Sequence, residues 1–169
     1  MNIDVIEKDA FKVMGFAVKT KIWRSGVAIG RLLRKIDKKG THENIPNRVD
    51  PDILYGISID FLKNKGVCSY MFAAEVSTFK NLPKDMETRT IPACKYVRFF
   101  VSPKDENIAK ILNVKNRKNY GALIRGAYRY LQEKWIPESG YKRADISEVF
   151  EIYDLKDIEE GIYVCVPIE

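Results

Sequence analysis

Two stretches of the chain repeat hydrophobic residues with the period of an α-helix. In the first the apolar positions recur at i, i+3, i+4 and i+7, and in the second at i, i+4, i+7, i+8, i+11 and i+15. These positions hold Ile29, Leu32, Leu33 and Ile36 in the first stretch, and Tyr120, Ile124, Ala127, Tyr128, Leu131 and Trp135 in the second. The pattern predicts an amphipathic helix from Ser25, as N-cap, to Gly40, and a second helix that Pro137 and Gly140 end.

The other apolar segments are rich in strand-forming residues. They cover residues 5–18 (broken at Lys8-Asp9), 53–61, 68–76, 86–101, 149–153 and 162–168. Between these segments the sequence predicts a loop over residues 41–52 and a polar connection over residues 102–118. It also predicts the turn of a hairpin at residues 63–66. The order strand, helix, strand, strand therefore occurs twice, in pseudo-repeats of about residues 1–80 and 81–169.

Neither repeat is large enough to bury a helix and a three-stranded sheet on its own. We therefore expect an α+β fold that forms a single domain over residues 1–169. Its duplicated β-α-β-β units share one continuous antiparallel sheet with two main helices. Small-molecule pockets form preferentially at such junctions, so a ligand groove is expected at the pseudo-twofold junction between the units.

Composition and charge narrow the class of protein. Hydrophobic residues make up 46% and charged residues 31%, the balance of a folded chain. No apolar run approaches the roughly 20 residues that cross a bilayer, and the acidic start does not fit a signal peptide, so we expect a cytoplasmic protein without membrane contact. The net charge of +6 lies mainly on the two helices, whereas residues 144–169 carry 1 basic and 8 acidic side chains. Solvated amphipathic faces explain the basic residues, and without a recognition-helix pair we expect no direct DNA binding.

Several kinds of catalytic or cofactor site are excluded by what the sequence lacks. His42 is the sole histidine, so a histidine-dependent triad or a multi-histidine zinc site has little to build on. The three cysteines, Cys68, Cys94 and Cys165, form no CxxC pair and are expected to be buried reduced thiols. The run from Gly121 to Gly126 lacks the lysine and hydroxyl residue of a phosphate loop. We expect no cofactor and no bound metal.

Three ordered stretches carry a family resemblance: LPKDMETRTIPACKY (82–96), WIPESGY (135–141) and FEIYD (150–154). Together with Tyr55-Gly56-Ile57 they resemble the GyrI-like family, the effector-binding domain of multidrug-sensing transcription activators. Cys94 stands where that family usually has glycine. The chain starts directly with its first strand, so the resemblance implies a stand-alone form that binds a small molecule without reading DNA. It also implies a functional carboxylate at Glu151.

Glu151 is unusual from its neighbours alone. It lies between Phe150 and Ile152, and strand alternation sends Glu151 and Tyr153 to the same face. If that face is the groove, the acid is desolvated and must be hydrogen-bonded, paired or kept for a cation. Strand alternation by itself favours a Glu151 side chain that points toward water. The family resemblance favours a Glu151 side chain that points into the ligand groove. Glu75, a second acid in an apolar strand, is expected to face the surface.

Aromatic side chains are the natural walls of a cation site, since a desolvated cation over ring faces gains roughly 0.5 to 2 kcal/mol. The candidates are Tyr55, Tyr96, Tyr128, Trp135 and Tyr163, of which Tyr55 and Tyr163 are favoured. Core packing explains the spacing of each one taken singly. The interpretation is a protein that binds lipophilic, often cationic aromatic small molecules around Glu151, as a sequestering or sensing protein. We also expect the empty site to raise the pKa of Glu151.

Two alternatives stay open. Some GyrI-like proteins hydrolyse strained electrophilic small molecules, and Glu151 would then be the general base, assisted by Tyr163 or Tyr55. The family name also suggests a gyrase-modulating module that binds a protein partner through the basic helix faces. No sequence feature separates a binding carboxylate from a catalytic one, so catalytic residues are not assigned.

Overall fold

A computed structural model describes residues 1–60 and 66–169, in which eight strands form one sheet. The strands are β1 (Asn2–Lys8), β2 (Phe11–Lys21), β3 (Ile53–Ile59), β4 (Val67–Glu75), β5 (Glu87–Ile91), β6 (Cys94–Val101), β7 (Glu148–Asp154) and β8 (Ile162–Ile168). The helical segments are η1 (Ile22–Arg24), α1 (Ser25–Lys39), η2 (Thr41–Asn44), α2 (Glu106–Ile111), α3 (Tyr120–Tyr130), η4 (Leu131–Trp135) and α4 (Ile136–Ser139). Within the described ranges, no helix is long and apolar enough to cross a bilayer.

Both predicted helices are present, with differences at their ends. Ser25 is the first residue of α1 and not its cap, because the 3₁₀ turn of η1 leads straight into the helix and Arg24 takes the N-cap position without a side-chain hydrogen bond. Gly40, with φ of 57°, ends α1 as predicted. The second helix continues past α3 through the π-helical turn η4 into α4, whose first turn accommodates Pro137. Gly140, with φ of 83°, is the residue that ends it.

The strand predictions hold with two refinements. The segment predicted as one strand over 86–101 is interrupted at residues 92–93 and forms β5 and β6. The connection predicted over 102–118 contains the short helix α2, whose N-terminus Asp105 caps by accepting hydrogen bonds from two backbone N–H groups. Phe61 and most of the predicted hairpin turn lie outside the described residues. Cys68 and Cys165 are buried as expected, Cys94 is partly exposed, and all three are free thiols.

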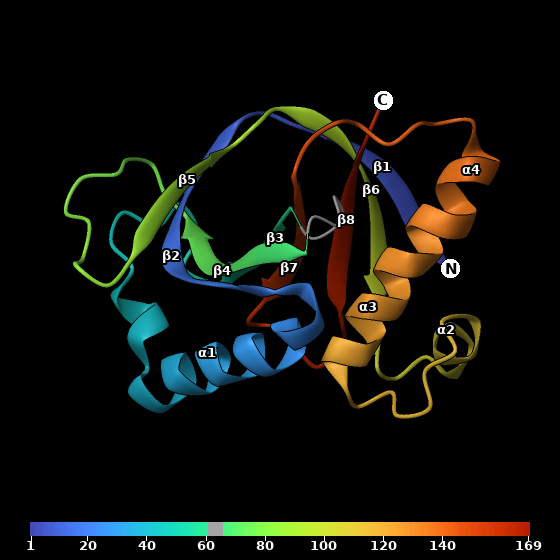
Figure 1. Cartoon of the computed structure of the whole chain (residues 1–169), viewed down its shortest axis with the longest axis horizontal. Coiled ribbons are helices and arrows are strands. Elements are labelled where there is room, and N and C mark those ends of the chain that lie inside the picture. Colours follow the sequence, from blue (N-terminus) through green and yellow to red (C-terminus); the bar gives the residue numbers. More distant parts are fainter. Residues whose placement is uncertain (61–65) are drawn as a thin grey trace.

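The sheet confirms the predicted arrangement of two joined units. Its strand order is β1-β6-β8-β7-β3-β4-β2-β5, and all of its paired strands are antiparallel. At the centre β7 of the second unit pairs with β3 of the first, which makes the sheet continuous across the two β-α-β-β units. The two halves therefore meet along this central pair of strands, and again where β1 pairs with β6 and β2 with β5 (Figure 1).

A long ribbon connects the two outer parts of the sheet. Residues 2–8 pair with 94–100, and residues 11–15 pair with 87–91 in the same register, from Asn2 opposite Phe100 to Gly15 opposite Glu87. Because β1 runs on into β2 and β5 into β6, this ribbon bends the sheet, and the four strands arch over the remaining ones (Figure 1). The sheet thus has a strongly curved shape with two distinct faces.

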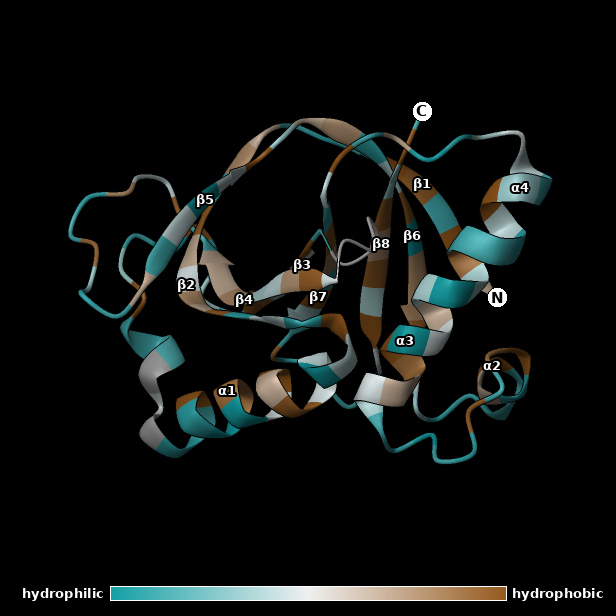
Figure 2. Ribbon diagram, viewed as in Figure 1, coloured by the Kyte–Doolittle hydropathy of each residue, from teal (hydrophilic) through white to brown (hydrophobic). Residues whose placement is uncertain are grey.

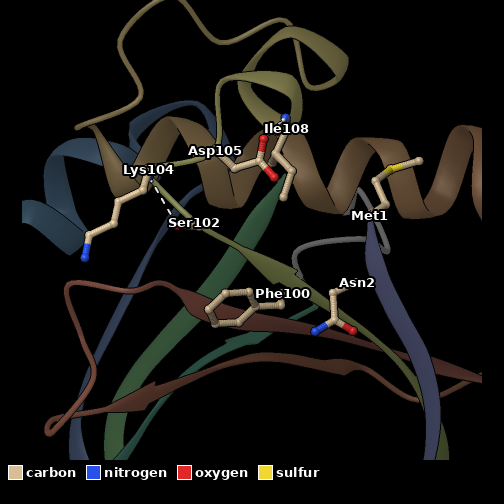
Figure 3. Close-up of a pocket in the computed structure, with 7 residues that line it drawn as sticks. All are labelled: Met1, Asn2, Phe100, Ser102, Lys104, Asp105 and Ile108. Atoms are coloured by element: carbon tan, nitrogen blue, oxygen red, sulfur yellow. Dashed lines mark hydrogen bonds between the residues drawn. The ribbon is translucent and has the colours of Figure 1, made fainter.

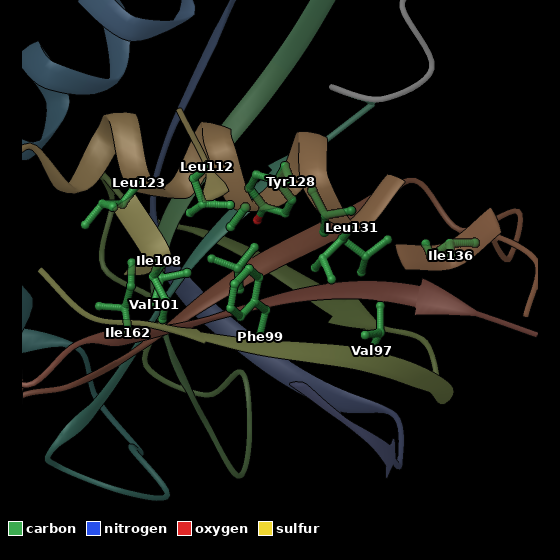
Figure 4. Packing of buried hydrophobic residues seen from close by; sticks show 14 of the residues in the cluster. Val97, Phe99, Val101, Ile108, Leu112, Leu123, Tyr128, Leu131, Ile136 and Ile162 are labelled. Carbon is green, nitrogen blue, oxygen red and sulfur yellow. The ribbon is translucent and has the colours of Figure 1, made fainter. Parts of the chain in front are cut away.

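The two helices cover the same face of the sheet. Below α3 lies a buried cluster that includes Phe99, Leu123 and Leu131 (Figure 4), and below α1 lies a second cluster that includes Ile36. Tyr153 of β7 packs against both clusters, so they meet at the junction of the two units. A third cluster fills the opposite face. Each helix turns its hydrophobic positions to the sheet and its polar ones outward (Figure 2).

Candidate functional site

The centre of the junction is occupied by a glycine and a glutamate. Glu151 is the middle residue of β7 and pairs directly with Gly56, the middle residue of β3. Only 2% of Glu151 is exposed, which is exceptional for an acid. The predicted alternation holds, because Phe150 and Ile152 lie in the cluster on the opposite face while Tyr153 shares the face of Glu151 below the helices. The carboxylate is therefore desolvated, as expected if it faced the junction.

Three tyrosine hydroxyls surround this carboxylate. The hydroxyl of Tyr128, from α3, donates a hydrogen bond of 2.6 Å to Oε1 of Glu151. The hydroxyl of Tyr70, from β4, donates a longer one of 3.5 Å to Oε2. The hydroxyl of Tyr153, two residues along β7, also interacts with this carboxylate. Hydroxyls from both units of the fold thus surround a single acid. One of them comes from a helix and the other two from the sheet.

Gly56 creates the space for this arrangement. A Cβ atom at position 56 would overlap Oε2 of Glu151 and the hydroxyl of Tyr70. Gly56 does not need glycine for its backbone conformation, since it pairs within a regular strand. The glycine of one unit is therefore required by the carboxylate of the other unit.

The pKa of Glu151 follows from this environment. Burial raises the pKa of its carboxyl to about 8, and the hydrogen bonds from Tyr128, Tyr70 and Tyr153 offset only part of that rise. The pKa values of the Tyr128 and Tyr153 hydroxyls are raised as well, first by burial and then by the nearby carboxylate. Burial therefore holds this acid towards its protonated form. The direction of this shift is the one expected for a desolvated acid.

A comparison with Glu148 on the same strand shows what Glu151 lacks. Glu148 is also buried, but Nε of Arg89 donates to its Oε1 at 2.6 Å, and the hydroxyl of Ser147 donates to its Oε2 at 2.9 Å. Within the described part of the chain, no lysine or arginine forms an ion pair with Glu151. Glu148 thus has a cationic partner from the protein, and Glu151 is left with neutral hydroxyls.

Of the five aromatic residues predicted to line the site, the structure brings one to the carboxylate, namely Tyr128. Tyr55 pairs with Ile152 and lies on the opposite face of the sheet, where its ring contacts Phe11 and its hydroxyl donates to Oε2 of Glu75 at 3.1 Å. Glu75 is mostly covered and also pairs with Lys8 at 3.1 Å, so it does not simply face water as expected.

Tyr96 and Tyr163 lie on that opposite face too. The Tyr96 ring packs against Phe150, and the Tyr163 ring lies below the guanidinium of Arg98 at 4.5 Å. Trp135 lies in η4, where its ring stacks on Tyr141 with centroids 6.0 Å apart. The role of these residues and of Tyr55 in ligand binding stays a prediction.

Tyr70 and Gly56 were missed as members of the site. Tyr70 lies on β4, which is not adjacent to β7, and it reaches Glu151 only because β3 carries a glycine between them. Strand alternation puts Tyr70 and Phe72 on one face, but the sequence does not show the register of β4 against β3. The available signal was a glycine in the middle of an apolar strand, which indicates a close approach of another group.

Two surface pockets lie away from this junction. One is bounded by β1, β6 and the segment before α2, and its lining residues are Met1, Asn2, Phe100, Ser102, Lys104, Asp105 and Ile108 (Figure 3). Its charged groups serve local structure, because Asp105 caps α2 and Lys104 pairs with Glu160. The other pocket lies beside Trp23 at the start of α1. We therefore place the candidate site at Glu151.

Solved structures share the whole fold at low sequence identity. SAV2435 bound to tetraphenylphosphonium has a TM-score of 0.74 and 14% identity over 100% of this chain and 94% of its own. A putative bacterial transcription regulation protein from Staphylococcus aureus MU50 has a TM-score of 0.72 and 16% identity, over 100% and 99%. An integron cassette protein from the mobile metagenome of Vibrio cholerae has a TM-score of 0.62 and 17% identity, over 99% and 95%.

No curated protein sequence matches the chain. A family model does, over residues 4–166, and its description is Cass2, integron-associated effector binding protein. The resemblance found in the sequence motifs and the arrangement of the two units are consistent with this match. The chain belongs to the Cass2 family of effector-binding proteins, with the GyrI-like fold.

Proposed function

We propose that this protein binds lipophilic, often cationic aromatic small molecules at Glu151, as a sequestering or sensing protein. The observation that carries the proposal is a fully buried carboxylate without a cationic partner among the described residues. Burying an acid in this way destabilises a protein unless something compensates. A site that keeps such an acid at the junction of its two halves is suited to receive a positive charge from outside.

The proton and the ligand compete for the same carboxylate. In the empty site the raised pKa holds Glu151 towards its protonated, neutral form. A cation beside the carboxyl lowers that pKa, and the proton leaves as the ligand enters. The hydroxyls of Tyr128 and Tyr70 already donate to the carboxyl oxygens and stabilise its ionised form.

The comparisons support a small-molecule ligand of this kind. The family is described as effector-binding, and a neighbour with the same fold was solved with tetraphenylphosphonium, a lipophilic cation that carries four aromatic rings. Since Glu151 is buried below α3 and contacted by the Tyr70 side chain from β4, the ligand has to displace the Tyr128 or Tyr70 ring to reach it. In this arrangement Tyr55, Tyr96 and Tyr163 contact the ligand only if it passes to the other face of the sheet.

The test is calorimetric titration with tetraphenylphosphonium, and with tetraphenylborate as a size-matched anion. We expect the cation to bind and the anion not to bind. The variant Glu151→Gln should weaken cation binding at least about tenfold, which corresponds to 1.4 kcal/mol. Glu148→Gln is the matched control, because it removes a second buried acid from the same strand that already has a partner in Arg89. It should leave the affinity unchanged.

Proton release distinguishes this mechanism from simple hydrophobic binding. Titrations at pH 7 in buffers of different ionisation enthalpy should report net proton release on cation binding, since the raised pKa holds the carboxyl towards its protonated form before the cation arrives. Full affinity in Glu151→Gln together with the absence of proton release would refute the proposal. Glu151-dependent turnover of a reactive cyclopropane compound would instead make Glu151 a general base and the protein a hydrolase.

A further inference from the structure

An exposed tryptophan stands out on the surface at the start of α1. Trp23 in η1 is 78% exposed, and Val27, one turn further on, is 55% exposed. Between them and the end of β2 lies a pocket of about 370 Å³, lined by Thr20, Lys21, Trp23, Arg24, Val27, Ala28 and Arg31. Tryptophan is normally well covered in a folded chain, so an exposed tryptophan beside a concave surface indicates that another molecule covers it.

The pocket is surrounded by positive charge. Residues 19–39 contain eight lysines and arginines and a single acid, Asp37. Within the described part of the chain, no acidic side chain pairs with Lys21, Arg24 or Arg31, and the guanidinium of Arg24 lies 5.4 Å from the Trp23 ring. This contrasts with Lys8, Lys104 and other cations that have carboxylate partners. The charge on this surface is therefore not neutralised by the protein itself.

We propose that the surface formed by η1 and the first two turns of α1 is a docking site for an acidic segment of a partner protein. An apolar side chain of that segment enters the pocket beside Trp23, and its flanking carboxylates pair with Lys21, Arg24 and Arg31. Tryptophan and arginine are the residues that most often dominate binding energy at protein interfaces, with an apolar centre and a polar rim. The charge of the surface selects an acidic partner.

Other occupants fit the surface less well. A second copy of this chain would bring the same basic residues together across a twofold axis. Single-stranded nucleic acid is held by several aromatic rings along a basic groove, whereas Trp23 is the one aromatic residue that lines this pocket. A membrane-surface helix needs a broad apolar face, and α1 uses its apolar face against the sheet, where Ile36 is buried.

The experiment begins with a random peptide display library selected on the wild-type protein and counter-selected on Trp23→Ala. Synthetic versions of the recovered peptides carry a fluorescent label and are titrated with each variant while the anisotropy of the label is followed, a readout that does not need Trp23. The comparison pairs Arg31→Glu with Lys38→Glu, which makes the same charge change on α1 outside the pocket. Circular dichroism confirms that each variant is folded, which is expected because Trp23, Arg31 and Lys38 are exposed.

The expected result is a set of peptides rich in aspartate and glutamate around a leucine or an aromatic residue. Their binding should be lost in Trp23→Ala, weakened at least tenfold in Arg31→Glu and less than threefold in Lys38→Glu, and weakened by salt. Failure to recover Trp23-dependent peptides, or recovery of peptides without acidic residues, overturns the proposal. So does equal Trp23-dependent binding of a thymidine oligonucleotide or of vesicles with anionic lipid. None of these outcomes depends on Glu151, so this proposal and the proposed function can fail separately.

Discussion

The replacement of Glu151 by glutamine should make the empty protein more stable at alkaline pH. The pKa of Glu151 is about 8 in the folded protein and about 4.5 in the unfolded chain. Below pH 4.5 both states are protonated. Between pH 4.5 and 8 the unfolded chain releases this proton and the folded protein keeps it, so the free energy of unfolding falls as the pH rises.

The size of the effect follows from the same two values. Since one pKa unit corresponds to about 1.4 kcal/mol, a rise of this size lowers the free energy of unfolding by several kcal/mol, at up to about 1.4 kcal/mol per pH unit. Glutamine keeps an oxygen for the Tyr128 hydroxyl but does not ionise. The stability of Glu151→Gln relative to the wild type should therefore rise by several kcal/mol from pH 5 to pH 8 and change little above that.

Urea unfolding of both proteins at pH 5, 6, 7, 8 and 9 measures this difference directly. Taking the difference between two nearly identical proteins removes the contribution of all other titrating groups. Glu148→Gln serves as a control for the loss of a buried carboxyl on β7. A stability difference between Glu151→Gln and the wild type that stays constant within about 0.5 kcal/mol over this range would refute the description of Glu151 as a buried neutral acid.

Two further substitutions examine the surroundings of the carboxyl. Tyr128→Phe removes the 2.6 Å hydrogen bond that favours the ionised form of Glu151, so the pKa of Glu151 should rise. Carbon NMR of the labelled Glu151 carboxyl measures this pKa. Tyr55→Phe, on the opposite face of the sheet, should leave the pKa of Glu151 unchanged. Gly56→Ala should lower the free energy of unfolding by about 1 to 3 kcal/mol through overlap with Glu151 and the Tyr70 hydroxyl, and less in a Glu151→Ala background, where the Tyr70 side chain can move into the vacated space. Additive effects within about 0.3 kcal/mol in that double-mutant cycle would contradict the close approach of the two residues.

Much of the fold could be predicted because hydrophobic periodicity reports local structure directly. The two helices and the repeated strand order follow from such patterns, and the shared sheet follows from the small size of each repeat. The sequence did not reveal the π-helical turn after Tyr130, because the apolar spacing continues through residues 131–135 as in an α-helix. It also did not reveal α2, which is six residues long and has no clear periodicity.

The candidate site was only partly predictable, because it depends on register between strands that are distant in sequence. Alternation around Glu151 identified the acid and its neighbour Tyr153, and helical spacing placed Tyr128 on the inner face of α3. The choice of Tyr55 as a favoured wall came from its strand alone. Tyr55 pairs with Ile152, the residue that follows Glu151 on β7. Because neighbouring residues of a strand point to opposite faces, Tyr55 lies on the face of the sheet opposite to Glu151.

The duplication of the β-α-β-β unit explains why this site contains a single acid. Gly56 and Glu151 occupy the middle of β3 and of β7 and face each other across the junction, so they hold corresponding positions in the two units. Two carboxylates in these positions would be desolvated beside each other, and one of them would have to stay protonated. With glycine in one unit, the side chain of the other takes the shared space, and the site can present one negative charge. Under the proposed function, a junction built in this way therefore selects a ligand with one positive charge over a neutral or doubly charged one.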